Sequence, residues 1–88
     1  MTEKKNKVVV EIFGESYSIK GEGETARMIE VAGLVDGRMR QIAKSNPRLS
    51  TAKVAVLVAL NLADEYLKLK DDYQELAELL ELVDEEKK

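Results

Sequence analysis

Few residues in this 88-residue chain could act chemically, because it contains no cysteine and no histidine. A disulfide framework, a thiolate or imidazole metal site, and a Cys or Ser–His nucleophile are therefore excluded. No pair of carboxylates follows a pattern typical of acid–base catalysis, and Gly14, Gly21 and Gly23 precede no phosphate-binding motif. The sequence predicts a protein that is not an enzyme and that uses neither a metal nor a cofactor.

Charged side chains are the remaining means of recognition. The net charge is −3, but residues 1–50 carry nine basic and seven acidic residues, whereas residues 51–88 carry five and ten. A solvated face is the alternative explanation for any few exposed basic residues. Arg40 and Lys44 are one helical turn apart and share a face. The candidate partner surface is the basic set Arg38, Arg40, Lys44 and Arg48.

The N-terminal half predicts a β-hairpin followed by a helix. Alternating residues 7–13 indicate a strand, Gly14-Glu15 suits a type II′ turn, and residues 16–20 indicate an antiparallel return strand. Gly33 and Gly37 lie one turn apart in the helix predicted for residues 24–45, which favours close approach of the hairpin or another helix, with a ligand backbone as the alternative. The predicted core face of this helix comprises Met28, Val31, Ala32, Val35, Met39 and Ile42.

The C-terminal half predicts one long helix. Pro47 ends the preceding helix, and either Ser50 or Thr51 can cap the next one. Residues 52–86 contain no glycine or proline, which predicts a helix about 50 Å long. Its apolar positions keep a strict heptad spacing, typical of a coiled-coil seam. The seam comprises Ala52, Ala55, Ala59, Leu62, Tyr66, Leu69, Tyr73, Leu76, Leu80 and Val83.

The far part of this seam has no remaining chain to cover it, so we expect another subunit to do so. The predicted oligomer interface comprises Leu62, Tyr66, Leu69, Tyr73, Leu76, Leu80 and Val83. Apolar residues beside the seam, such as Val56, Val58 and Leu79, indicate more than two helices. The predicted fold class is therefore α+β in the order β-β-α-α, with a head at residues 1–50 and an oligomerising helix at residues 51–88.

Two stretches of the chain resemble the ZapA family of bacterial cell-division proteins. They are Val10-Glu11-Ile12-Phe13-Gly14 with its short return strand, and Ala59-Leu60-Asn61-Leu62 followed by Glu65-Tyr66 near the start of the heptad helix. The resemblance covers nearly the whole chain. It implies a β-β-α head that dimerises, a coiled-coil helix, and dimers that can pair into an antiparallel tetramer. It also implies a partner, FtsZ, the tubulin-like GTPase of the division ring.

The function that the resemblance implies is one that a symmetric oligomer could perform. Its members are non-enzymatic cross-linkers that bind FtsZ filaments through charged groups of the head, bundle them, and promote Z-ring assembly and septum formation at mid-cell. Arg38 matches a basic position of the family, and Lys44 and Arg48 fall in its basic stretch before the long helix. Glu15 departs from the family, because relatives can carry an arginine after this glycine. That departure puts a hairpin contribution to filament binding in doubt.

Other functions are less well supported. A cytoplasmic coiled-coil adaptor with another partner is the alternative to an FtsZ-binding protein. Nucleic-acid binding is disfavoured by the net charge of −3 and the lack of stacking aromatic residues. The longest apolar run, residues 54–60, is far shorter than the roughly 18 residues of a membrane span. With no secretory signal at the N-terminus, we expect an intracellular protein.

Overall fold

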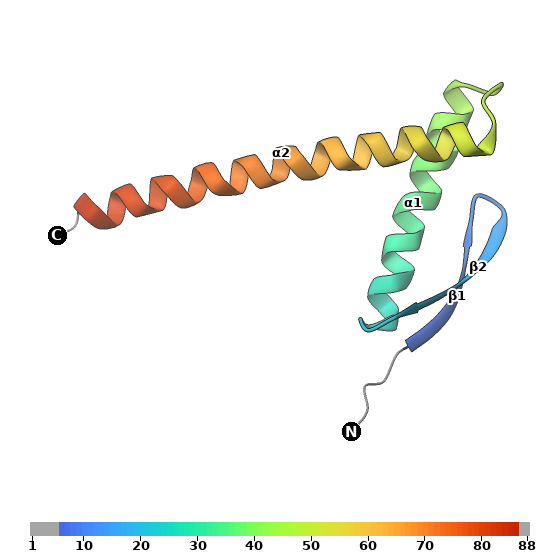
Figure 1. Cartoon of the computed structure of the whole chain (residues 1–88), viewed down its shortest axis with the longest axis horizontal. Coiled ribbons are helices and arrows are strands. Elements are labelled where there is room, and N and C mark those ends of the chain that lie inside the picture. Colours follow the sequence, from blue (N-terminus) through green and yellow to red (C-terminus); the bar gives the residue numbers. More distant parts are fainter. Residues whose placement is uncertain (1–5, 87–88) are drawn as a thin grey trace. The chain divides into compact units, whose positions relative to one another are not determined.

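The computed structural model describes residues 6–86 (Figure 1) and the side chains of residues 7–83. It contains β1 (Asn6–Ile12), β2 (Glu15–Gly21), α1 (Thr25–Ser45) and α2 (Thr51–Glu86). This order confirms the predicted α+β fold of a hairpin followed by two helices, the second long. The chain divides into two units, one ending at Val58 and the other beginning at Ala59.

The hairpin has a different turn from the one predicted. β1 and β2 pair antiparallel from Asn6 opposite Gly21 to Ile12 opposite Glu15, so that Phe13 and Gly14 form a two-residue turn. Their φ angles are 53° and 84°, as in a type I′ turn, whose twist matches that of the strands. The prediction of a type II′ turn at Gly14-Glu15 is therefore wrong. A left-handed conformation costs a non-glycine residue such as Phe13 about 1 kcal/mol, so another interaction must support this turn.

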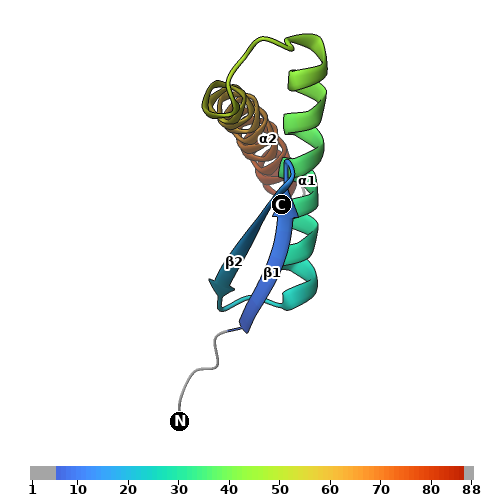
Figure 2. The same cartoon turned by 90° about the vertical axis from the view of Figure 1, so that its right-hand side faces the viewer.

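The core of the first unit lies between the hairpin and α1, which run side by side (Figure 2). Val10 of β1 and Ala32 and Met39 of α1 are buried, whereas Met28, Val35 and Ile42 are half-buried. Val31, predicted on the same face, is 50% exposed. It lies at the edge of the apolar face, about 100° round the helix from Ala32, and the two-stranded hairpin is too narrow to cover it.

The start of α2 belongs to the same core. The Ser50 side chain accepts a hydrogen bond from the Lys53 backbone N–H at 3.2 Å, so Ser50 is the N-cap of the helix. Val54 and Val58, one turn apart, are 1% and 3% exposed. Val58 therefore packs in the core of the first unit. It is not available beside a coiled-coil seam, so the prediction that it flanks the seam is wrong. None of the described helices combines the length and the apolar content that crossing a bilayer requires.

Candidate partner-binding and oligomer surfaces

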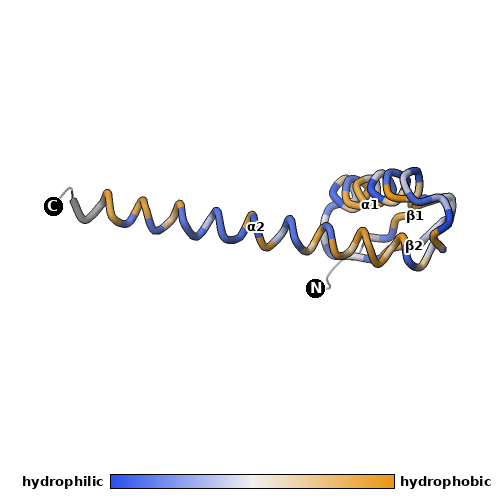
Figure 3. Tube along the Cα trace, turned by 90° about the horizontal axis from the view of Figure 1, so that it is seen from above, coloured by the Kyte–Doolittle hydropathy of each residue, from blue (hydrophilic) through white to orange (hydrophobic). Residues whose placement is uncertain are grey.

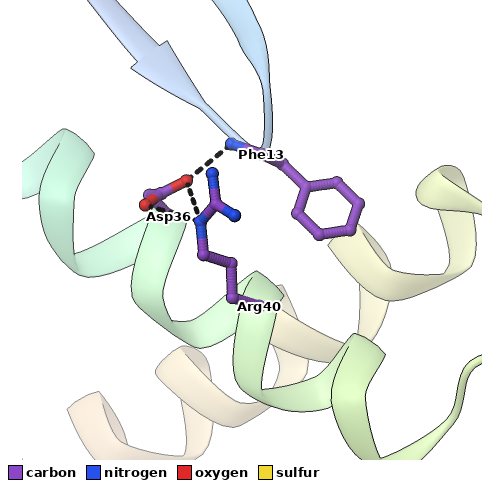
Figure 4. Close-up of polar contacts among 3 residues, drawn as sticks. All are labelled: Phe13, Asp36 and Arg40. Atoms are coloured by element: carbon purple, nitrogen blue, oxygen red, sulfur yellow. Dashed lines mark hydrogen bonds and ion pairs between the residues drawn. The ribbon is translucent and has the colours of Figure 1, made fainter.

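The side chain of Asp36 ties the hairpin turn to α1 (Figure 4). Its Oδ1 atom accepts a hydrogen bond from the backbone N–H of Phe13 at 2.7 Å. The same carboxylate accepts from Nε of Arg40, which lies 3.1 Å from both oxygens. One aspartate thus connects the turn, the middle of the helix and an arginine one helical turn further on. Asp36 also explains the turn. It binds the Phe13 N–H, which in the predicted pairing with a turn at Gly14-Glu15 would have donated to the opposite strand.

These hydrogen bonds also shape the electrostatics of the site. The N–H of Phe13 is the main cause of a lowered pKa of the Asp36 carboxyl, and the Arg40 guanidinium lowers that pKa further. Partial burial of the carboxylate opposes both effects. Because the ionised form is the better acceptor, the folded protein favours the charged state of Asp36.

Acid is expected to remove the contribution of Asp36 to stability. Its pKa in the folded chain lies below its ordinary value of 3.8, so the unfolded state binds more protons and stability rises with pH. The contribution is present above about pH 4 and is lost as the pH falls through the folded pKa. We expect the difference in Tm between wild type and Asp36→Asn to shrink as pH falls from 6 toward 2. A difference that stays constant over this range would contradict the assignment.

The four predicted basic residues do not form one surface. Arg40 and Lys44 are exposed on the same side of α1. Arg38 is half-buried and points about 200° round the helix from Arg40, which places it on the other side. Arg48 is exposed in the connection to α2. The structure therefore brings Arg40 and Lys44 together and separates Arg38 from them. Asp36 was not among the predicted site residues, although its spacing of four residues from Arg40 on a predicted helix was a signal in the sequence.

The two glycines of α1 lie on the side of Arg40 and Lys44. Gly33 and Gly37 each precede one of these residues by seven positions, which is close to two helical turns. Apart from its chain neighbours and the adjoining backbone of α1, no atom of the described residues lies within 4 Å of a Cβ atom built at either glycine. Within residues 6–86, the predicted close approach of the hairpin or another helix to these glycines therefore does not occur. Space beside these two glycines is therefore open in the described part of the chain.

Alanine at these positions is expected to stabilise the protein. Gly33→Ala and Gly37→Ala should each raise the free energy of unfolding by about 1 kcal/mol, the difference in helix propensity. For a chain of this size, that change corresponds to a rise in Tm of roughly 4–8 °C, measured by thermal unfolding at one fixed concentration. Destabilisation, or dissociation of the oligomer, would instead indicate that a partner subunit packs closely against this face.

Most apolar residues of α2 between residues 59 and 83, where side chains are described, are exposed. Figure 3 shows apolar segments recurring turn after turn along this helix. Tyr66, Leu69 and Tyr73 are 63%, 69% and 72% exposed, and together with Lys70 they line a shallow, almost wholly apolar groove. Of the predicted interface only Leu62 is half-buried, and the others are exposed. Leu79, next to the seam residue Leu80, widens the stripe on one side, whereas the exposed Leu67 and Leu82 lie on the outer side of the helix.

The first unit also has apolar residues that nothing in the described chain covers. Val31 and Leu34 on α1 are each about half exposed, at 50% and 49%. Val56 near the start of α2 is 58% exposed, and together with Leu49 and Leu57 it lines a second apolar hollow. Exposed apolar residues that gather in patches mark interaction surfaces. Both units therefore have apolar surface that a partner could bury.

Comparisons with known proteins agree with this architecture. A family model described as "Cell division protein ZapA" matches residues 8–87. The chain is similar to the cell division protein ZapA of Bacillus pumilus, with 47% identity over 72 residues that cover 82% of this chain and 85% of the relative. It is also similar to that of Bacillus anthracis, with 41% identity over 75 residues that cover 85% and 84%. Among solved structures, a ZapA mutant dimer from Geobacillus stearothermophilus matches with a TM-score of 0.75 and 44% identity, covering 92% and 95% of the two chains.

Proposed function

The chain belongs to the ZapA family of bacterial cell-division proteins, and on that premise we propose that it binds FtsZ filaments and cross-links them into bundles. In doing so it promotes Z-ring assembly and septum formation at mid-cell, in the cytoplasm. It acts without catalysis, as a homo-oligomer with several filament-binding sites. The observation that carries the proposal is the row of exposed apolar residues along α2, which a soluble chain must bury against further copies of itself.

Oligomerisation supports cross-linking for a geometric reason. A symmetric oligomer presents identical sites at separate places, so that one molecule can hold two filaments. Two simultaneous contacts also raise the effective affinity without strengthening either one. The likeness to a solved ZapA dimer supports a homodimer. The exposed Leu79 beside the seam makes the stripe wider than a two-helix seam needs, which favours a dimer of dimers.

The basic residues of the head supply the filament-binding surface in this proposal. Arg40 and Lys44 form one side of it, beside the hairpin turn, and their neighbours Gly33 and Gly37 leave room for a partner to approach. Arg48 follows in the connection to α2, and Arg38 offers a second contact on another side of α1. Such exposed charges speed the association with a partner of opposite charge and make it sensitive to salt.

Co-sedimentation with FtsZ tests the proposal. FtsZ is pelleted with and without this protein, in GTP and in GDP, at two salt concentrations. We expect GTP-dependent enrichment of both proteins in the pellet and a smaller enrichment at the higher salt concentration. Failure to co-pellet while FtsZ polymerises normally would overturn the proposal. The chain would then be a coiled-coil adaptor for a different partner.

A further inference from the structure

We infer that Asp36 is a positioning residue of the partner-binding surface, which holds the hairpin turn and the Arg40 guanidinium together in the arrangement that meets the filament. This inference rests on the proposed function and deepens it. It assigns a role to an acidic residue inside a surface expected to act through its positive charge. Its basis is the set of hydrogen bonds from Phe13 and Arg40 to one carboxylate.

The contact with the turn fixes where the hairpin ends relative to α1. Phe13 is 23 residues from Asp36 in the sequence, so the hydrogen bond joins two elements that no local interaction connects. At 2.7 Å the bond is short, as expected for a backbone N–H that donates to a charged carboxylate. The turn it holds is unfavourable for Phe13, whose φ is 53°. Asp36 therefore offsets part of a backbone cost and selects this turn over the alternative pairing.

The contact with Arg40 fixes the orientation of a guanidinium. Asp36 engages Nε only, which leaves the two terminal nitrogens of Arg40 as donors for a carboxylate of the partner. The Arg40 side chain remains 58% exposed, whereas that of Asp36 is 27% exposed. In Figure 4 the guanidinium lies between Asp36 and Phe13, next to the turn. A long side chain that is already ordered loses less entropy when a partner binds.

Two explanations of this cluster predict changes of opposite sign. If the surface acted through net charge alone, Asp36 would weaken attraction to an acidic partner, and its neutralisation would strengthen binding. If Asp36 positions the turn and Arg40, its neutralisation weakens binding although the surface becomes more positive. The direction of the change therefore distinguishes positioning from simple attraction.

Asp36→Asn is the informative variant, and Glu30→Gln is its matched control. An asparagine keeps a side-chain oxygen for the N–H of Phe13, so the hairpin is retained, but it loses the charge that holds Arg40. Glu30 also faces an arginine of α1, Arg27, at 3.9 Å, and both side chains are about three-quarters exposed. The two substitutions remove the same charge from the same helix, but only one of them touches the turn. Asp36→Ala removes both contacts and serves as the stronger variant.

Affinity for FtsZ filaments is measured for the full-length protein and each variant, together with the oligomer mass. We expect Asp36→Asn to lower the affinity about 3- to 10-fold, the cost of ordering one long side chain on binding. Asp36→Ala should lower it further, and Glu30→Gln should leave it unchanged or slightly raised. The resonances of the Phe13 amide and the Arg40 Nε–H, recorded by NMR, report the geometry directly. Both should move in Asp36→Ala, and neither should move in Glu30→Gln.

The possible failures are distinguishable. If wild-type protein does not bind FtsZ filaments, the proposed function falls, and the assignment of this cluster to a filament surface falls with it. If wild type binds and Asp36→Asn binds equally well or better with its mass unchanged, only the positioning role is overturned. Phe13 and Arg40 resonances that stay in place in Asp36→Ala would also overturn it.

Discussion

Leu76→Glu is expected to dissociate the oligomer, raising its dissociation constant at least 100-fold. Leu76 is 53% exposed on α2 and lies within the proposed interface, between Tyr73 and Leu80. A glutamate there would place an unpaired charge in an apolar seam, which costs several kcal/mol. Every subunit of a symmetric assembly carries the substitution, so the free-energy cost of the unpaired charge is incurred once in each copy. The mass of the protein, measured by sedimentation equilibrium over a range of concentrations, tests this expectation.

Gln74→Glu is the control for this variant. It adds the same charge in the same turn of α2, two residues before Leu76, but outside the heptad seam. Its mass should equal that of wild type at every concentration. If Leu76→Glu also kept the wild-type mass, the subunits would have to associate through exposed apolar residues of the first unit, such as Val31, Leu34 and Val56.

Arg38→Glu combined with Lys44→Glu is expected to abolish the bundling of FtsZ filaments without changing the oligomer mass. Since Arg38 and Lys44 point to different sides of α1, the double variant reverses charge on both candidate faces at once. Reversal replaces attraction by repulsion, and we expect at least about tenfold weaker binding at each site. A cross-link needs two filament-binding sites to be occupied at once. A tenfold loss of binding at each site therefore lowers bundling by about 100-fold. Light scattering of polymerising FtsZ and electron microscopy of the filaments measure the effect.

Lys7→Glu combined with Lys20→Glu is the matched control for the charge. These two lysines lie opposite each other in the hairpin, at its open end and away from the turn, and both are exposed. The variant changes the net charge of the head by the same amount. It should bundle FtsZ as wild type does. Equal loss in both double variants would show that the total charge of the head matters and not these particular residues.

The order and type of the elements could be predicted because each has a clear period in the sequence. Residues 7–13 alternate, whereas residues 52–86 repeat every 3.5 positions without a glycine or proline. The turn could not be predicted in the same way. Phenylalanine rarely adopts positive φ, and what stabilises it here is Asp36, far away in the sequence. The local sequence pattern therefore predicted the helices and strands correctly. It did not predict the turn, which depends on a tertiary contact.

The candidate surfaces were predicted less completely than the fold. The basic residues were found from their type, but helical spacing alone already separates Arg38 from Arg40. The roles of Gly33 and Gly37 could not be predicted, because they depend on what lies beside the helix, and no other element of the described chain approaches them. Val31 was misplaced because the width of the hairpin, and not the pattern of α1, decides how much of the helix is covered.

The turn at Phe13 and Gly14 has a consequence for which mutations the protein can tolerate. A side chain at Gly14 would have free space around it, yet its φ of 84° disfavours every residue with a Cβ atom. Phe13 has the reverse problem, since its backbone would suit glycine or asparagine better, while its half-buried ring favours a large apolar residue. Neighbouring positions are thus restricted for opposite reasons, one by conformation and the other by packing. During sequence divergence, the two positions would therefore accept different residues. A change at one position would not compensate for a change at the other.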